Sequence, residues 1–276
     1  MTEKQRYFIE LSFDGTIYHG WQIQKNAVSV QEVVNEKLSV ILRQPIETTG
    51  CGRTDTGVHA RTFFAHFDAE EESIVHGPRS MVDRNSKKKI ANNKIAAPMD
   101  YGLSTMDNFV RSINSILPED IAIKRMFPIA ADANARFDAT LRTYEYHIHF
   151  NKDPFRTGYS WELRDRPDLN LMNKAAEIVK EYTDFSCFSK SNTQVKTNIC
   201  KISTAEWVVN GDGIIFKISA DRFLRNMVRA IVGTLIMAGK KEIEPEAVRN
   251  IIESKNRSNA GMSVPACGLY LTEVAY

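Results

Sequence analysis

Two hydrophobic periods follow one another at the start of the chain, and their order constrains the fold more than any other feature. Apolar residues alternate in "RYFIELSF" (residues 6–13), which predicts a β-strand. They then recur at helical spacing in "VSVQEVVNEKLSVILRQP" (residues 28–45), which predicts a helix capped by Ser29. Because each element has one apolar face to bury, a helix packed on a sheet is the expected opening unit.

The second half of the chain repeats this order of strands and helices. Further strands are expected at about 45–51 and 62–68, followed by a helix at about 104–116. The later expected elements are strands at 142–150, 198–209, 213–219 and 268–276, and helices at 169–182, from Arg222 to about Ala238, and near 245–254. The pattern predicts an α+β protein of two similar halves, residues 1–128 and 129–276. Their mainly antiparallel strands are expected to join edge to edge, with a cleft where the halves meet.

Composition places the chain among ordinary globular proteins. It has 276 residues, of which 43% are hydrophobic, enough for substantial cores. No run approaches the roughly 18 apolar residues of a membrane span, and "MTEKQRYFIELSF" lacks the layout of a secretory signal. The four cysteines form no C-x-x-C pair, so we expect reduced thiols, no metal site, no membrane and a cytoplasmic location.

Positive charge is concentrated in one segment. The net charge is only +2, yet residues 76–100 contain six basic and two acidic side chains, including Lys87, Lys88 and Lys89. This basic segment makes up most of an insertion at about 76–105 in the first half. Two interpretations remain open: contact with a phosphate backbone, or a solvated loop.

One short loop places a carboxylate among small residues. In "GCGRTDTGVHA" (residues 50–60), glycines flank Arg53, Thr54 and Asp55. Such a loop can hold a side chain out at a chosen angle. Either Asp55 bonds to the backbone of an ordinary turn, or it performs chemistry. Farther along, Arg222, Arg225 and Arg229 recur at i, i+3 and i+7, which predicts a row of guanidinium groups on one helix face.

Six motifs together resemble the tRNA pseudouridine synthase A family. They are "FDGTIYHGWQIQ", "GRTDTGVHA", "NARFDATLRTYEYHI", "DFSCFS", "FLRNMVRAIVG" and "ACGLYL". Their order and spacing match over nearly the whole chain, apart from the longer segment at about 76–105. The resemblance implies the pseudouridine synthase fold, with two ferredoxin-like halves. It also implies a cofactor-free isomerase that acts on uridines at tRNA positions 38, 39 and 40 in the anticodon stem-loop, and a homodimer that holds one tRNA.

The resemblance also assigns roles to particular residues. Asp55 occupies the position of the catalytic aspartate, with Arg229 as its ion-pair partner, and Arg53 binds the flipped nucleotide or its backbone. Tyr144 stacks on the target base and is a candidate for proton removal from C5. The remaining substrate or RNA contacts are expected at Arg222, Arg225 and Leu271. Asp55 attack on C6 of the base, its attack on C1′ of the ribose, and a glycal intermediate all remain open.

Other classes of function fit less well. An RNA-binding module with the same architecture has no use for a carboxylate aimed at an anionic ligand. A zinc nucleobase deaminase requires H-x-E and P-C-x-x-C motifs, which are absent from the sequence. An N-glycoside hydrolase needs a second acid in a comparable motif, and none is found. An isomerase is therefore the expected function.

Overall fold

The computed structural model describes residues 4–70, 74, 101–189 and 197–276. Its centre is a nine-stranded sheet with the order β4-β1-β3-β9-β5-β8-β7, to which β2 adds on β3 and β6 on β5. The strands are β1 (Lys4–Phe13), β2 (Thr49–Gly50), β3 (His59–Glu70), β4 (Ile121–Ile129), β5 (Leu141–His149), β6 (Trp161–Glu162), β7 (Ile202–Asn210), β8 (Gly213–Ala220) and β9 (Leu269–Ala275). Among the strands that the structure describes, only the β3/β9 and β5/β6 pairs are parallel. The expected α+β fold with a mainly antiparallel sheet is confirmed.

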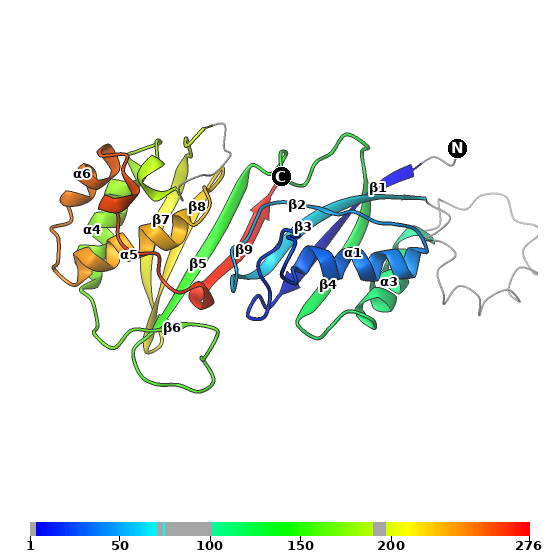
Figure 1. The fold of residues 1–276 in the computed structure, drawn as a ribbon, viewed down its shortest axis with the longest axis horizontal. Coiled ribbons are helices and arrows are strands. Elements are labelled where there is room, and N and C mark those ends of the chain that lie inside the picture. The colour runs from blue at the N-terminus through cyan, green and yellow to red at the C-terminus, as the bar shows by residue number, and fades with distance from the viewer. Residues whose placement is uncertain (1–3, 71–73, 75–100, 190–196) are drawn as a thin grey trace, which may run out of the picture.

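Helices pack at both ends of this sheet (Figure 1). Helices α1 (Val30–Leu42) and α3 (Tyr101–Asn114) lie with the first strands, whereas α4 (Leu169–Lys180), α5 (Met227–Gly239) and α6 (Ala247–Glu253) lie with the later ones. The basic segment with Lys87, Lys88 and Lys89 lies outside the described residues. Its contact with phosphate therefore stays a prediction.

Strand β9 joins the two groups of elements. Although it comes last among the strands, it lies between β3 and β5, parallel to the first and antiparallel to the second (Figure 1). His59 pairs with Tyr270 and Ala60 with Leu271, so β9 meets β3 at the residues that follow the loop of Asp55. The expected division after residue 128 falls at the end of β4 and stays a prediction.

Strand β5 separates its side chains between the two faces of the sheet. Arg142 and Tyr144 are buried on one face, and the alternating Glu145 and His147 are partly buried on the other. The first face adjoins the loop of Asp55, because the Arg142 guanidinium donates to the carbonyl oxygen of Cys51. The other face holds His147 and Tyr270, whose rings pack edge to face at 4.9 Å.

Helix α1 begins where the sequence predicts it. Ser29 is its N-cap, and its hydroxyl accepts from the backbone N–H of Glu32 while the Glu32 carboxylate accepts from the backbone N–H of Ser29. This capping box satisfies two N–H groups that otherwise lack partners at a helix start. It matters for the site, because the backbone N–H of Val30 also donates to the carbonyl of Gly20 at 3.1 Å, beside the loop of Asp55.

Replacing Ser29 by alanine removes one half of the capping box. We expect the free energy of unfolding to fall by about 1 kcal/mol, measured by urea denaturation. Ser112→Ala, at a half-buried position inside α3 and away from its cap, is the matched control and should change stability by less than about 0.5 kcal/mol. Equal stability of the Ser29→Ala variant and the unmodified protein would contradict a capping role.

Candidate active site

Close backbone contacts with residues 18–20 hold the loop between β2 and β3 in place. Gly57, with φ of +76°, donates its N–H to the carbonyl of Tyr18 at 3.2 Å. Gly20 lies so near the loop that a Cβ there would be 2.2 Å from the carbonyl oxygen of Thr54. Only glycine fits that approach, because any side chain would push the loop away. The loop that carries Asp55 is therefore fixed in position by the "YHG" segment.

Asp55 lies between two arginines without being hydrogen-bonded to either. Its Oδ1 is 3.6 Å from Nε of Arg225, and its Oδ2 is 3.9 Å from Nη1 of Arg229. The Asp55 side chain is 20% exposed. Among the described residues, none donates a hydrogen bond to its carboxylate. Asp55 thus lies beside two positive charges and keeps its lone pairs free of hydrogen bonds from the described residues, which leaves them available for nucleophilic attack.

The two arginines are held differently. Arg229 lies in the first turn of α5, its side chain is 20% exposed, and its Nε donates to the carbonyl of Val264 at 2.7 Å. Arg225 is 61% exposed. Arg229 is therefore anchored to the protein by its hydrogen bond to Val264, whereas Arg225 contacts Asp55 from a largely exposed position.

The expected row of arginines on one helix is wrong in part. Helix α5 starts at Met227 rather than Arg222, so Arg222 and Arg225 lie in the segment that precedes it. Asn226 has φ of +65°, in the left-handed region that asparagine tolerates better than most residues, and its amide donates to the hydroxyl of Ser263. This break turns the chain, so that Arg225 approaches Asp55 from a loop.

Tyr144 lies on the inner face of β5 with little exposure. Its ring meets Phe223 edge to face at 5.2 Å, and the residue is 9% exposed. Burial raises the pKa of its hydroxyl, and the nearby Cys51 and Asp55 raise it further. The phenol is therefore neutral throughout the physiological range. Leu271, its partner in β9, is 1% exposed, which makes it a wall of the core behind Tyr144.

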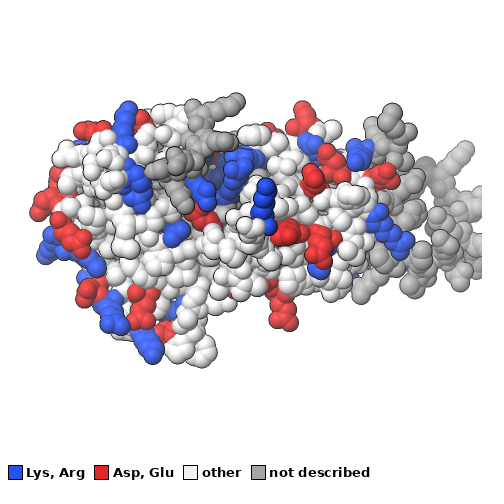
Figure 2. Space-filling model, viewed as in Figure 1, with Lys and Arg blue, Asp and Glu red and all other residues white. Residues whose placement is uncertain are grey.

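Arg53 and Arg222 belong to a group of like charges. The pKa of Arg136 is lowered by desolvation and then by the charges of Arg53, Arg142 and Arg222. Among the described residues, neither Arg53 nor Arg136 forms an ion pair with an acid. In Figure 2, basic side chains gather at the middle of the molecule, near the strands that join its two ends. Such an uncompensated group favours an anionic ligand.

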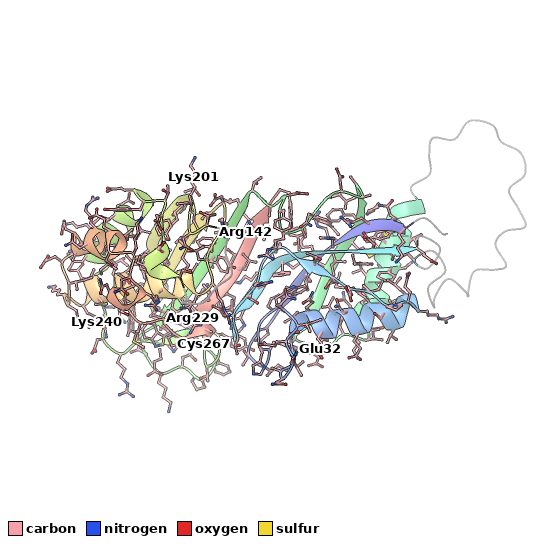
Figure 3. All side chains as sticks on the ribbon, turned by 45° about the horizontal axis from the view of Figure 1, so that its top comes forward. Glu32, Arg142, Lys201, Arg229, Lys240 and Cys267 are labelled. Atoms are coloured by element: carbon pink, nitrogen blue, oxygen red, sulfur yellow. The ribbon has the colours of Figure 1, made fainter. Side chains whose placement is uncertain are left out.

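Arg142 is a buried residue beside the site that sequence reasoning missed. Its buried guanidinium lies between the two ends of the molecule (Figure 3) and donates five hydrogen bonds to main-chain carbonyls. Two reach Cys51, and one each reaches Arg136, Ala139 and Asp221. All five N–H groups of an arginine are thereby used. The available signal was its position two residues before Tyr144, which places a charge on the buried face of the strand.

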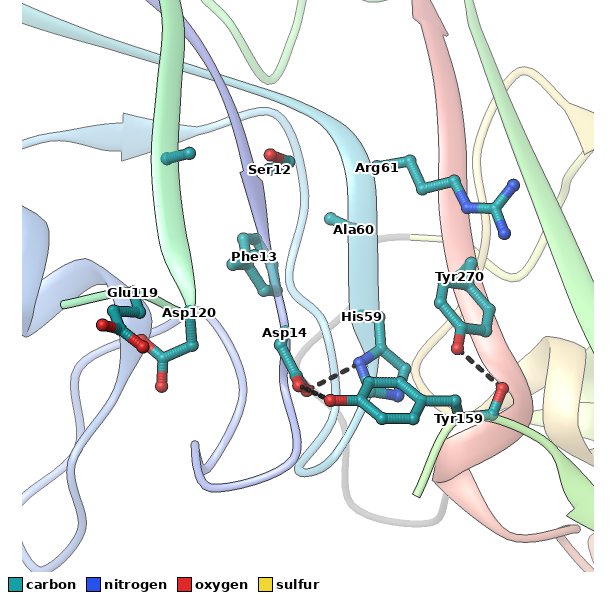
Figure 4. A pocket seen from close by; sticks show the side chains of 11 residues that line it. Ser12, Phe13, Asp14, His59, Ala60, Arg61, Glu119, Asp120, Tyr159 and Tyr270 are labelled. Carbon is teal, nitrogen blue, oxygen red and sulfur yellow. Dashed lines mark hydrogen bonds and ion pairs between the residues drawn. The ribbon is translucent and has the colours of Figure 1, made fainter. Parts of the chain in front are cut away.

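A cavity on the other face of the sheet is separate from Asp55. It has a volume of about 290 Å³, and Asp14, His59, Asp120, Tyr159 and Tyr270 are among its lining residues (Figure 4). His59 is 2% exposed, stacks on Tyr270 at 4.6 Å and lies 3.0 Å from the Asp14 carboxylate. These contacts make His59 a structural residue that anchors the start of β3.

The described residues offer no cluster of three or more metal-binding side chains. His147 bonds instead to Glu145 at 2.9 Å, and His149 to the hydroxyl of Ser160 at 3.0 Å.

Burial raises the pKa of the Cys51 thiol to about 11, which keeps it protonated. In the part of the chain that the structure describes, every helix is too short or too polar to cross a membrane.

Arg142→Lys keeps the charge but removes the planar fork. Lysine has three donors and reaches fewer of the four carbonyls, so we expect the free energy of unfolding to fall by about 2–4 kcal/mol. Urea denaturation measures this change. Arg43→Lys, at the exposed end of α1, provides the control and should stay within about 0.5 kcal/mol of the unmodified protein. Equal stability of the two variants would show that charge alone suffices at residue 142.

Comparisons with known proteins identify the family of the chain. A family model described as tRNA pseudouridine synthase matches residues 182–276. Proteins named tRNA pseudouridine synthase A are similar over nearly the whole chain. That of Bacteroides fragilis is 44% identical, covering 99% of this chain and 96% of the relative. That of Parabacteroides distasonis is 41% identical with the same coverage, and that of Clostridium acetobutylicum is 34% identical over 97% of this chain and 98% of the relative. The chain therefore belongs to the tRNA pseudouridine synthase A family.

Proposed function

We propose that this protein is an isomerase that converts uridine to pseudouridine in tRNA, with Asp55 as the nucleophile. The observation that carries the proposal is the Asp55 carboxylate, free of hydrogen bonds from the described residues and placed between Arg225 and Arg229. The family supplies the substrate class, since the relatives are named as tRNA pseudouridine synthases. The geometry supplies a group able to attack it.

The reaction exchanges one bond of the base for another. The bond from N1 to C1′ breaks, the uracil ring turns, and C5 bonds to C1′; the proton of C5 is lost and N1 gains one. Asp55 attacks either C6 or C1′, or assists a glycal route, and these three alternatives remain open. A target base that enters the site excludes water and so removes solvent that would otherwise stabilise the charge of the Asp55 carboxylate. The fixed guanidinium of Arg229 opposes that effect.

Tyr144 is best suited to stacking. A flipped base needs an apolar surface to replace its neighbours in the helix, and the Tyr144 ring is held edge-on by Phe223. Removal of the C5 proton by Tyr144 would first require loss of the phenolic proton, which the raised pKa opposes. We therefore assign Tyr144 the stacking role and keep proton removal as its second candidate role. Leu271 would form the wall behind it.

The finer parts of the proposal concern substrate and assembly. Arg53, Arg222 and Arg225 would contact the RNA backbone, because they lie around Asp55 or in its charged group. We propose uridines 38, 39 and 40 of the anticodon stem-loop as targets, a homodimer as the working form, and the cytoplasm as its location. We also propose residues 1–128 and 129–276 as two halves that each supply one side of the cleft. Family membership supports the first three.

The second candidate, an RNA-binding module without chemistry, is disfavoured by Asp55. A carboxylate in a basic cleft repels phosphate and weakens binding, so a pure binder gains nothing from it. Incubation of unmodified tRNA with the purified protein, without added nucleotide or metal, followed by pseudouridine mapping, separates the two. Product at uridines 38–40 supports the proposal. Stable binding without product supports the module.

Asp55→Asn is expected to abolish pseudouridine formation, since the amide keeps the shape of the side chain but is a far poorer nucleophile. Single-turnover assays measure the rate, and filter binding measures the dissociation constant for tRNA, which should stay within about tenfold of the unmodified protein. A variant that retains more than a few per cent of the rate would refute the assignment of Asp55.

Arg229→Ala should also be severely impaired, because it removes the anchored cation beside Asp55. We expect a rate loss of about a hundredfold or more, corresponding to roughly 3 kcal/mol. Arg229→Lys, which keeps a charge but loses the bond to Val264, is the graded comparison and should fall between the two. An unchanged rate for Arg229→Ala, with normal folding by circular dichroism, would assign the pairing to Arg225 instead.

A further inference from the structure

Every backbone N–H group in the turn from Asn134 to Asp138 donates a hydrogen bond. The Asn134 side chain accepts from the backbone N–H of Arg136 at 2.9 Å and of Phe137 at 3.2 Å. The backbone N–H of Asn134 donates to Asp138 Oδ2 at 2.7 Å, and that of Asp138 to the Asn134 carbonyl at 3.1 Å. This hydrogen-bonded turn fixes the directions of the two side chains between its ends.

The neighbouring residues attach the turn to the rest of the molecule. The carbonyl of Arg136 accepts from Nη2 of Arg142 at 2.7 Å. Ala135 is fully buried, with its N–H bonded to His66 and its carbonyl bonded to the hydroxyl of Tyr276. The turn is therefore a rigid part of the sheet face, although it lies in the connection between β4 and β5.

The side chains of Arg136 and Phe137, which this turn presents to solvent, make few contacts with the rest of the described protein. Phe137 is 77% exposed. The Arg136 guanidinium lies over the Phe137 ring at 5.6 Å and pairs with no acid among the described residues. Because the Phe137 ring and the Arg136 guanidinium both remain accessible to solvent, these two side chains contribute little to folding.

Arg136 also faces the loop of Asp55 across a small polar pocket. The pocket has a volume of about 100 Å³, and its lining includes Gln22, Gly50, Gly52, Arg53 and Arg136. A Cβ at Gly52 would meet nothing within 4 Å, so the loop backbone is open on this side. In the described part of the chain, the N–H groups of Gly52 and Arg53 have no protein acceptor. Two guanidinium groups and free backbone N–H groups around one pocket are suited to a phosphate.

We propose that this pocket and turn bind the nucleotide next to the target uridine, with its phosphate between Arg136 and Arg53 and its base stacked on Phe137. The inference rests on the proposed function and adds a second nucleotide site to it. Aromatic stacking and arginine contacts with phosphate are the usual means of holding single-stranded RNA. Because Gly52 and Arg53 precede Asp55 by only a few residues, a phosphate held there positions the adjoining uridine at the carboxylate.

The stacking part is tested with 2-aminopurine, which changes its fluorescence when it stacks. The probe is an anticodon stem-loop RNA with 2-aminopurine on one side or the other of the target uridine. It is bound to the Asp55→Asn protein so that no turnover occurs. We expect one of the two positions to respond on binding, and the response to be lost in Asp55→Asn/Phe137→Ala with a fivefold to hundredfold weaker affinity. Phe155→Ala, which removes a ring that is 92% exposed elsewhere, should retain the response.

The phosphate part is tested by a double substitution of protein and RNA. Replacing one flanking phosphodiester by an uncharged methylphosphonate should weaken binding about as much as Arg136→Gln does. Combining the two should add little further loss, because they remove the same contact. Arg136→Gln should also lower the slope of log affinity against log salt by about one. Arg43→Gln serves as the control, since Arg43 is exposed at the C-terminal end of α1 and does not line the pocket.

The outcomes separate this inference from the proposed function. If the unmodified protein forms no pseudouridine in unmodified tRNA, the proposed function fails. If it does, but Phe137→Ala and Arg136→Gln both keep its affinity, salt slope and fluorescence response, the second nucleotide site is overturned. Fully additive losses from the methylphosphonate and Arg136→Gln would overturn the phosphate contact. A change of sedimentation in Phe137→Ala, with an unchanged RNA response, would assign Phe137 to contact between two copies of the chain.

Discussion

The site depends on one buried guanidinium. All five N–H groups of the Arg142 guanidinium donate to carbonyl oxygens from three separate segments. Cys51 belongs to the loop of Asp55, and Arg136 and Ala139 lie in or next to the Asn134–Asp138 turn. Asp221 lies in the segment before α5. Each carbonyl would be costly to bury without a partner. The fork of Arg142 therefore fixes the spacing between the carboxylate and the arginines that approach it from the other side.

The same arrangement leaves the site with more positive than negative charge. The charge of Arg142 is stabilised by carbonyl dipoles and is not paired with an acid among the described residues, and Arg53, Arg136 and Arg222 add their charges around it. Asp55 is held near Arg225 and Arg229 at distances too long for hydrogen bonds. An RNA backbone would supply the missing anions. The RNA backbone and Asp55 are both negatively charged, so both are attracted to the same group of cations. Arg229, which is anchored by its bond to Val264, stays beside Asp55 when the other arginines contact RNA.

The sequence predicted local features well and long-range ones less well. Ser29 and the spacing that follows it predicted α1, because capping and periodicity are both local. The start of α5 was missed, since its apolar spacing continues through the break that Asn226 makes, and the break depends on a contact with Ser263. The roles of Asp55 and Arg229 came from family motifs and remain proposals. Arg142 was missed because its partners are scattered along the chain, from Cys51 to Asp221.

The position of β9 has a consequence for the order in which the molecule is made. Until residues 269–275 have been synthesised, the facing edges of β3 and β5 lack the strand that joins them. A chain on the ribosome can form the two ends of the sheet early, because their contacts are largely within each end. The inner wall with Leu271 comes only afterwards. The sheet is therefore completed late in synthesis, and an unfinished chain would expose the edges of β3 and β5 that β9 later covers, which require protection from pairing with other chains.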